Sequence, residues 1–293
     1  MDITLALGGG GVRGIAHVGV LRVLEREGFH IRAIAGTSIG SIISVLYAYG
    51  NTPDQIEDFL SNVDQSRLYG WPLSDGPGLL GVRGISDFLK TQLGKSTFEN
   101  LKLPCAAVAV DLNSNREIIL RRGKVVDAIL GSIAIPGLFP PREIDEYLLI
   151  DGGVLDPVPV RAARTLMPGL PVVAVSLMAP LDAPTIPLNI PSTVPKQLAD
   201  HITRLQVTRA FRIFADAIDI AQRQMTELRL QIDSPEVLVR PMVNDLNLLE
   251  RIDVHEVASR GDRAMELALP DLFRAVSLPR RAIRRLRQMV TGA

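Results

Sequence analysis

The stretch from Ala33 to Tyr49, AIAGTSIGSIISVLYAY, constrains the fold of this chain more than any other, because it contains a G-x-S-x-G pentapeptide at Gly36 to Gly40. The short apolar run Ile31 to Ala35 predicts a buried strand. The run Ile39 to Tyr49 continues until a glycine and then a proline, which predicts a helix that ends there. Ser38 is therefore expected in a sharp strand-to-helix turn with a glycine two residues away on each side, the geometry of a nucleophile elbow.

The same stretch has two simpler interpretations. It contains no charged residue from Ala33 through Pro53, so its hydropathy is also that of a membrane span. The glycine and small polar residues at Gly36-Thr37-Ser38 interrupt the apolar pattern in the middle, which argues against a span. A G-x-S-x-G sequence also occurs by chance in turns of small residues, so the pentapeptide needs support from other parts of the chain.

The composition limits the classes of protein to which the chain can belong. Its 293 residues are 47% hydrophobic and 22% charged, which predicts one large domain or two small ones with a sizeable core. The formal net charge of +0 argues against nucleic acid as the main partner. The N-terminus shows no basic segment of a secretory signal, and a single cysteine allows no internal disulfide, so a cytoplasmic location is expected.

A glycine-rich loop follows the first apolar run of the chain. Ile3 to Leu7 predicts a strand, Gly8 to Gly14 forms the loop, and Ile15 to Glu27 carries apolar residues at helical spacing. A glycine loop at the N-terminus of a helix presents bare backbone N–H groups, so this loop is a ready site for an anion.

Residues Gly9 to Gly14 also spell G-x-G-x-x-G, the fingerprint of a dinucleotide site. That fingerprint needs an acidic residue near the end of the second strand, where this chain has Gly36-Thr37-Ser38. No G-K-[ST] follows, which excludes a P-loop. The loop is better explained as an oxyanion hole, in which each preorganised N–H donor contributes about 3 kcal/mol to transition-state binding. Arg13 would add positive charge beside the loop, or would be an ordinary surface arginine.

A carboxylate lies at another predicted strand end. Tyr147 to Ile150 predicts a strand, and Asp151 follows it together with Gly152 and Gly153, which signal a turn. Strands alternate with helices along most of the chain, so we expect a largely parallel sheet with helices on both faces. The glycine loop, Ser38 and Asp151 would then meet at one edge of the sheet, where α/β folds bind ligands. A serine hydroxyl needs a base to accept its proton, and Asp151 is the candidate base.

Three further segments carry weaker signals. The irregular apolar segment Ser66 to Gly84 predicts either a lid or lipid-facing rim, or a loop folded onto its own core. A long helix is expected over about Lys196 to Leu230. Residues 277–293, after a single domain of residues 1–276, predict a basic amphipathic helix. This helix either rests on anionic lipid or, as we favour, presents a solvated basic face while it packs on the body or on a partner chain.

Four blocks of the sequence, taken in order, resemble the patatin-like phospholipase family. The blocks are Gly9 to Gly14, Gly36 to Gly40, Gly131 to Pro136 and Asp151 to Gly153, with Gly131 where the family commonly has an alanine. The resemblance covers roughly residues 3–180 and is greatest to bacterial single-domain members of the lysophospholipase and neuropathy-target-esterase type. It implies a patatin-like, three-layer α/β/α fold with a mostly parallel central sheet.

The resemblance also implies a lipolytic acyl hydrolase, of the phospholipase A or lysophospholipase type, with a Ser-Asp dyad and no catalytic histidine. Ser38 would attack the ester carbonyl, and Asp151 would accept its proton and later activate water. The N–H groups of Gly9, Gly10 and Gly11 would hold the oxyanion, and the scheme requires no metal or cofactor. The expected partner is a lipid or fatty-acyl ester substrate.

Two alternatives differ from this expectation. An α/β-hydrolase-type esterase with a Ser-Asp-His triad is permitted by the chain order Ser38, Asp151, then His201 or His255. A non-catalytic lipid-binding or scaffold protein could use the same fold. Phospholipid, lysophospholipid, a neutral glyceride and a small ester all fit these residues as substrates. The reaction could be acyl transfer instead of hydrolysis, and the protein could also contact a membrane peripherally.

Overall fold

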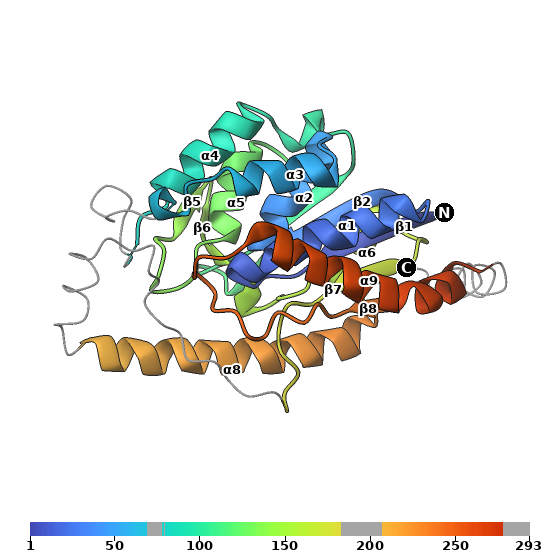
Figure 1. The fold of residues 1–293 in the computed structure, drawn as a ribbon. Coiled ribbons are helices and arrows are strands. Elements are labelled where there is room, and N and C mark those ends of the chain that lie inside the picture. Colours follow the sequence, from blue (N-terminus) through green and yellow to red (C-terminus); the bar gives the residue numbers. More distant parts are fainter. Residues whose placement is uncertain (69–77, 79, 183–206, 278–293) are drawn as a thin grey trace.

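The computed structural model describes residues 1–68, 78, 80–182 and 207–277, which form a central β-sheet between layers of helices (Figure 1). The described strands make one eight-stranded sheet in the order β5-β6-β3-β2-β1-β7-β8, with β4 paired to β3 outside this path. Their bounds are Asp2–Leu7 for β1, His30–Thr37 for β2, Cys105–Asp111 for β3, Arg116–Leu120 for β4, Arg142–Ile144 for β5, Tyr147–Asp151 for β6, Val172–Val175 for β7 and Val237–Val239 for β8.

The sheet is mixed rather than parallel throughout. β1 is parallel to β2 and to β7, β2 is parallel to β3, and β7 is parallel to β8, as expected from strands that alternate with helices. β4 and β6 are antiparallel to β3, and β5 is antiparallel to β6. Only residues 145 and 146 connect β5 to β6, and Asp145 has a positive φ of 51°. A connection this short can join only antiparallel strands.

The strands β2 and β6 meet end to end along one edge of β3. Thr37 of β2 pairs with Val108, and Asp151 of β6 pairs with the next residue, Ala109, while β4 pairs along the other edge. Because β2 is parallel to β3 and β6 is antiparallel to it, the two strands run towards each other. Their carboxyl ends therefore meet, and the residues that follow them are brought together.

Helices cover both faces of the sheet, so the predicted three-layer α/β/α arrangement is confirmed (Figure 1). One face carries α1, α2, α5 and α9 with α3 and α4 beside them, and the other carries α6 and α8. The bounds are Ala16–Arg26 for α1, Ile39–Tyr49 for α2, Pro53–Ser61 for α3, Arg83–Leu93 for α4, Val125–Ser132 for α5, Val160–Leu166 for α6, Val207–Asp233 for α8 and Val254–Val276 for α9.

The bounds of the helices agree with the sequence-based predictions in part. α2 begins and ends at the predicted residues, and Gly50 stops it with a left-handed φ of 112°. The glycine loop does not lead straight into a helix as predicted, because Gly11–Ile15 first forms a short 3-10 turn, η1. The long helix α8 ends at Asp233 rather than Leu230, and its predicted start at Lys196 lies outside the described residues.

Two predicted surface segments lie largely outside the described residues. They are the basic helix in residues 278–293 and the apolar residues 69–77 and 79. Of the described part of the apolar segment, Leu80 is 2% exposed and its N–H donates to the carbonyl of Leu138 over 2.9 Å, so this part folds onto the core. No helix within the described ranges is both long and apolar enough to cross a bilayer. The uncharged stretch that hydropathy alone would read as a span is instead a strand, a turn and a helix.

Candidate active site

Ser38 forms the junction between β2 and α2, with backbone angles of φ 54° and ψ −126°. A positive φ is uncommon for a residue other than glycine and costs about 1–3 kcal/mol. The flanking glycines provide space rather than unusual angles. A Cβ on Gly36 would lie 2.1 Å from the carbonyl oxygen of Gly40, and a Cβ on Gly40 would lie 2.2 Å from that of Leu7. The predicted sharp turn is present, and the serine itself carries its strain.

Asp151 is the hydrogen-bond partner of Ser38. The Oγ of Ser38 donates to Oδ2 of Asp151 over 2.5 Å, and the N–H of Gly153 donates to Oδ1 over 2.7 Å. Ser38 is 6% exposed and Asp151 is 2% exposed. Burial raises the pKa of Asp151 to about 6, against the opposing effect of these two hydrogen bonds. Gly152 lets this turn approach β3, because a Cβ there would lie 2.3 Å from the carbonyl oxygen of Val108.

The glycine loop lies directly against Ser38. A Cβ on Gly9 would lie 3.2 Å from the Cβ of Ser38. The N–H of Gly9, one of the three expected oxyanion donors, instead donates to the carbonyl of Pro157 over 3.0 Å. The N–H groups of Gly10 and Gly11 make no hydrogen bond to any residue that the structure describes. Two of the three expected donors therefore have no partner among the described residues, and both glycines line the same cavity as Ser38.

Two glycines of the loop are required by close packing. Gly11 has a φ of 58°, and a Cβ there would lie 2.1 Å from the carbonyl oxygen of Leu248. A Cβ on Gly14 would lie 2.3 Å from Cγ1 of Ile39, so this glycine lets η1 pack against the start of α2. A side chain at either position would displace the loop or the residue against which it packs.

Arg13 is buried, so its interpretation as an ordinary surface arginine is wrong. The residue is 4% exposed, and its Nε donates to the carbonyl of Leu246 over 2.8 Å. Burial lowers the pKa of its guanidinium, and the negative charge of Asp219 is the largest effect that raises it. Arg13 lines the same cavity as the glycine loop and Asp151.

Ser132 holds the backbone of Ser38 and is not among the site residues predicted from the sequence. The N–H of Ser38 donates to Oγ of Ser132 over 2.9 Å, and that hydroxyl donates to the carbonyl of Val108 over 2.6 Å. Ser132 has no exposed surface. It lies in the block Gly131 to Pro136 that carries part of the family resemblance, but its partner is 94 residues away in the chain. No local pattern reveals such a contact.

Replacing Ser132 by alanine is expected to lower the free energy of unfolding by about 1–3 kcal/mol, because the buried N–H of Ser38 and the carbonyl of Val108 lose their partner. We also expect a lower kcat with little change in KM, since the turn that holds the Ser38 hydroxyl loosens while the cavities keep their walls. Urea unfolding and steady-state ester hydrolysis measure the two effects.

Ser44→Ala is the matched control for this substitution. Ser44, on α2, is buried like Ser132, but its hydroxyl has no hydrogen-bond partner among the described residues. Removal of this hydroxyl should therefore be neutral or stabilising. An unchanged kcat in Ser132→Ala would contradict a positioning role for Ser132.

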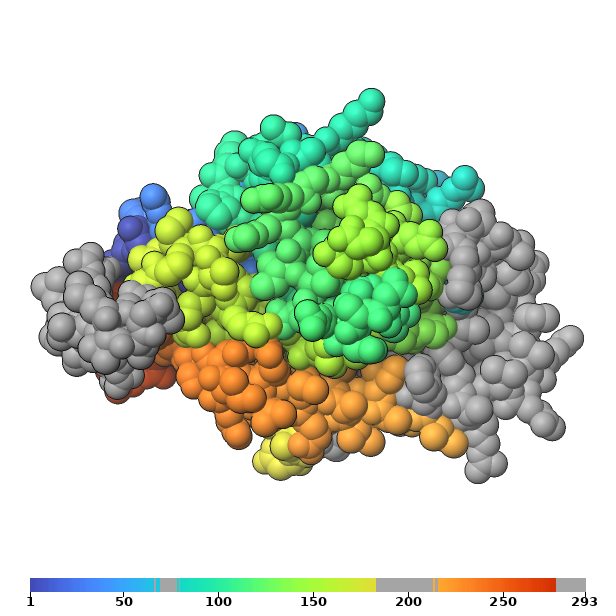
Figure 2. All heavy atoms as spheres, turned by 180° about the vertical axis from the view of Figure 1, so that it is seen from behind, coloured from blue at the N-terminus to red at the C-terminus, as the bar shows by residue number. Residues whose placement is uncertain are grey.

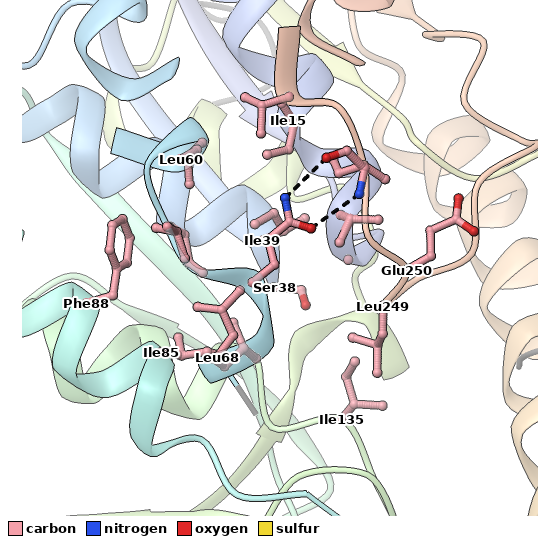
Figure 3. Close-up of a pocket in the computed structure, with 18 of the residues that line it drawn as sticks. Ile15, Ser38, Ile39, Leu60, Leu68, Ile85, Phe88, Ile135, Leu249 and Glu250 are labelled. Carbon is pink, nitrogen blue, oxygen red and sulfur yellow. Dashed lines mark hydrogen bonds between the residues drawn. The ribbon is translucent and has the colours of Figure 1, made fainter. Parts of the chain in front are cut away.

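An apolar cavity of about 130 Å³ opens at Ser38 (Figure 3). Two hydrogen bonds between the side-chain amide of Gln65 and the backbone of Ile252, of 3.2 and 3.3 Å, tie together two segments of its wall. Most of the side chains that line the cavity are aliphatic or aromatic. Such a lining accepts a hydrocarbon chain and disfavours a charged group. Its apolar lining includes Ile15, Ile39, Ile42, Leu60, Leu68, Ile85, Phe88, Ile133, Ile135, Phe139, Leu249 and Ile252.

A second cavity, of about 70 Å³, also has Ser38 in its wall. It differs from the first in its polar lining, which comes from the glycine loop, Ser38, Asp151 and residues of α8. The hydroxyl of Ser38 therefore lies where an apolar and a polar cavity meet. The charged and amide side chains of the polar cavity are Arg13, Asp151, Asp216, Asp219, Gln222 and Asn247.

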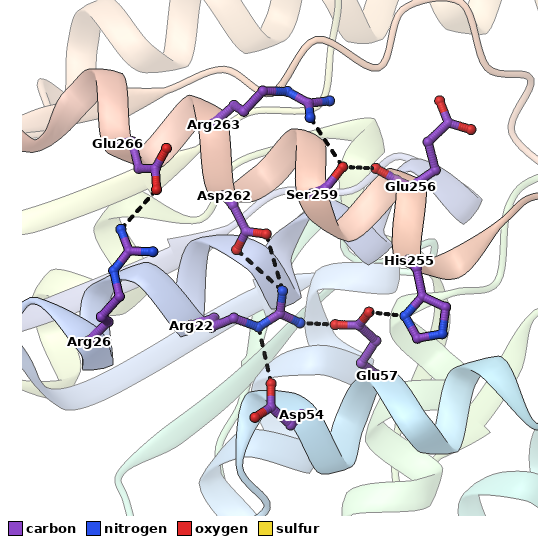
Figure 4. A network of polar contacts seen from close by, with 10 residues as sticks. All are labelled: Arg22, Arg26, Asp54, Glu57, His255, Glu256, Ser259, Asp262, Arg263 and Glu266. Atoms are coloured by element: carbon purple, nitrogen blue, oxygen red, sulfur yellow. Dashed lines mark hydrogen bonds and ion pairs between the residues drawn. The ribbon is translucent and has the colours of Figure 1, made fainter.

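The histidines do not complete a triad in the described part of the chain. Nδ1 of His255 contacts the carboxylate of Glu57 in a network of charged side chains between α1, α3 and α9 (Figure 4). The carboxylate of Asp151 takes its hydrogen bonds from a serine hydroxyl and a glycine N–H, and no histidine among the described residues contacts it. The other candidate, His201, lies outside the described residues.

Comparison with known proteins relates this chain to a recognised family. A family model described as patatin-like phospholipase matches residues 5–164. A protein of Mycobacterium tuberculosis (strain ATCC 25618 / H37Rv) named "Uncharacterized NTE family protein" is 38% identical over 160 residues, which cover 54% of this chain and 44% of the relative. The rat (Rattus norvegicus) patatin-like phospholipase domain-containing protein 7 is 30% identical over 174 residues, which cover 56% of this chain and 13% of that protein.

These relatives are longer than the matched region, so the chain spans less than half the length of the curated relatives that it matches. Among solved structures, VipD from Legionella pneumophila aligns with a TM-score of 0.47 and 12% identity, covering 92% of this chain and 66% of VipD. The type III effector protein ExoU aligns with a TM-score of 0.43 and 14% identity, covering 92% of this chain and 53% of ExoU.

Proposed function

Because the chain belongs to the patatin-like phospholipase family, we propose that it is a lipolytic serine acyl hydrolase, with Ser38 as the nucleophile and Asp151 as the base. The observation that carries this proposal is the 2.5 Å hydrogen bond from Oγ of Ser38 to Oδ2 of Asp151, at the meeting point of an apolar and a polar cavity. A carboxylate in this position can take the hydroxyl proton as the oxygen attacks. The curated relatives are longer proteins, so the proposal rests on the family and on the site of this chain, and not on the activity of any one relative.

The reaction proceeds in two halves. In the first, Oγ of Ser38 bonds to the ester carbonyl carbon while its proton moves to Oδ2 of Asp151. The carbon–oxygen bond to the leaving alcohol then breaks, the alcohol takes the proton from Asp151, and the acyl group stays on Ser38. In the second half, Asp151 takes a proton from water, the water oxygen attacks the acyl-serine, and the fatty acid leaves as the proton returns to Ser38.

The free N–H groups of Gly10 and Gly11 are the proposed oxyanion donors. Negative charge develops on the former carbonyl oxygen in each tetrahedral intermediate, and a preorganised N–H donor stabilises it by about 3 kcal/mol. The N–H of Gly9 supports the loop through Pro157, and the N–H of Ser38 is bound to a hydroxyl. Arg13 adds positive charge to the same cavity.

The two cavities indicate which part of the substrate lies where. The apolar cavity suits the acyl chain, because its lining is almost entirely aliphatic and aromatic. The polar cavity suits the alcohol half of the ester, because it contains the dyad, the glycine loop and several charged or amide side chains. We therefore propose esters of an apolar acyl chain with a polar alcohol, which is the composition of a lipid ester.

Labelling with an alkyl fluorophosphonate tests this proposal directly. Activated Ser38 is expected to bond to the phosphorus with loss of fluoride, and peptide mass spectrometry would locate the adduct. Esters of p-nitrophenol with graded acyl chains should be hydrolysed, with kcat/KM rising as the chain fills the apolar cavity. His255→Ala should behave like the parent protein, because His255 contacts Glu57. Absence of both labelling and hydrolysis would overturn the proposed activity.

A further inference from the structure

The long helix α8 has its amphipathic faces reversed relative to an ordinary surface helix. Its outer side carries Ile213, Ile220, Leu228 and Ile232, which are 64%, 54%, 51% and 65% exposed. Ala217 and Ala221 lie between them at helical spacing and are also exposed, and we call these six residues the α8 outer stripe. At the residues of α8 whose exposure the structure describes, 213 and 216–233, the other exposed side chains are those of Gln224 and Gln231, so no exposed residue is charged.

The inner side of α8 is mainly polar, apart from the buried Leu230, and ion pairs hold it on the body. The guanidinium of Arg229 lies 3.2 Å from the carboxylate of the buried Asp156 and 3.3 Å from that of Glu117 on β4. Arg240, just after β8, pairs with Glu227 over 2.5 Å. A soluble helix usually buries its apolar face and exposes its charged one. In α8 the large apolar side chains of the outer side are more than half exposed, so no described part of the chain covers them.

The helix is also part of the candidate active site. Asp216, Asp219 and Gln222 on its inner side line the polar cavity that contains Ser38. A Cβ on Gly153 would lie 2.9 Å from Nε2 of Gln222, so α8 packs directly against the turn that carries Asp151. Whatever binds the α8 outer stripe therefore lies one helix diameter from the cavity, about 10 Å.

We propose that the α8 outer stripe docks on a lipid surface. The stripe is about 28 Å long at 1.5 Å per residue, and it belongs to α8, whose atoms form the orange band on the molecular surface in Figure 2. At a helix width of about 10 Å it offers roughly 300 Å², well below the roughly 800 Å² that each partner of a stable dimer buries. A convex, uncharged helix face that is mainly apolar, with two glutamines, suits insertion into the boundary between lipid head groups and acyl chains.

This docking rests on the proposed function and deepens it, because it places the entrance of the site at the source of its substrate. A lipid ester leaving the surface would reach the polar cavity past the inner side of α8. The inference assigns membrane contact to α8, whereas the sequence suggested the apolar segment near Ser66 or the basic residues 277–293. It predicts faster hydrolysis of lipid in vesicles than of the same ester in dispersed form.

Two substitutions on the outer stripe, Ile220→Glu together with Leu228→Glu, test the inference. The matched control is Leu267→Glu, because Leu267 is 83% exposed on α9, away from the stripe. Binding is measured by sedimentation with vesicles of ether-linked phosphatidylcholine, which contain no ester to hydrolyse. Activity is measured on vesicles of ester-linked lipid and on a soluble short-chain p-nitrophenyl ester, and circular dichroism checks that each variant folds.

The double variant is expected to lose vesicle binding and vesicle hydrolysis by about tenfold or more, the effect of withdrawing one or two large apolar side chains from lipid. The soluble ester should be hydrolysed as before, and Leu267→Glu should match the parent protein in all assays. Vesicle binding unchanged by the double substitution would overturn the inference. So would light scattering that shows a dimer which the double variant converts to a monomer. Vesicle binding that depends on the stripe, without hydrolysis of any ester, would support docking while rejecting the proposed activity.

Discussion

Ser38→Ala is expected to reduce kcat/KM for ester hydrolysis by about 10⁵-fold, to near the background rate. The substitution removes the only atom that can form the acyl-enzyme bond in the proposed reaction, while the glycine loop and both cavities keep their shape. The measurement is hydrolysis of p-nitrophenyl esters by purified protein, with fluorophosphonate labelling as a second readout. A variant that keeps more than a small fraction of the activity would show that another residue is the nucleophile.

Ser38→Gly separates catalysis from backbone strain. Both substitutions remove the same hydroxyl and the same hydrogen bond to Asp151, but glycine adopts the positive φ of 54° without steric cost. We therefore expect the glycine variant to be more stable than the alanine variant by about 1 kcal/mol, after the entropy cost of glycine is subtracted from the relieved strain. Equal stability, measured by urea unfolding, would mean that the strain at this turn is no larger than the entropy cost of glycine.

Asp151→Asn is expected to reduce kcat by about 10³–10⁴-fold with a small change in KM. An amide keeps the size of the side chain and can still accept the N–H of Gly153, but it cannot take the proton of Ser38. In the parent protein the pKa of Asp151 is raised to about 6, so kcat/KM should rise with pH up to about 6 and then level off. If Asp151→Asn keeps substantial activity, the base has been assigned wrongly.

The same substitution should stabilise the fold at neutral pH. The pKa of Asp151 rises from 3.8 to about 6 on folding, so between these values the folded state binds more protons than the unfolded state. Stability therefore falls as pH rises through this window, and above pH 6 the folded protein bears the full cost of a buried ionised carboxylate. Asp151→Asn removes that cost, about 1–3 kcal/mol at pH 8, and the advantage should vanish below about pH 4. Urea unfolding across this range measures it.

The local elements of the site could be predicted because their signals lie within a few residues of one another. The alternation of apolar runs with glycine loops predicted β1, β2 and α2, and α2 has the predicted bounds of Ile39 and Tyr49. The G-x-S-x-G pentapeptide predicted the sharp turn at Ser38. The Asp-Gly-Gly sequence predicted that Asp151 ends a strand. Each prediction depends on side-chain spacing, backbone room or the missing Cβ of glycine, all properties of a short segment.

The features that were not predicted depend on partners far apart in the chain. Arg13 is buried because residues near Leu246 cover it, and the N–H of Gly9 is used because Pro157 lies beside it. Ser132 supports Ser38 across 94 residues. On α8, residue spacing indicates two faces, but only the contacts with β4 and with Arg240 establish that the polar face is the inner one.

The meeting of Ser38 and Asp151 shows this division most clearly. The sequence predicts both residues at strand ends, and on that basis we expected them at the common carboxyl edge of a parallel sheet. In the fold they meet because β2 and β6 approach each other from opposite directions along one edge of β3. Strand ends follow from local turn chemistry, so the residues themselves were predictable. Strand direction and pairing follow from packing between distant segments, so the 2.5 Å contact between the two side chains is a property of the tertiary structure.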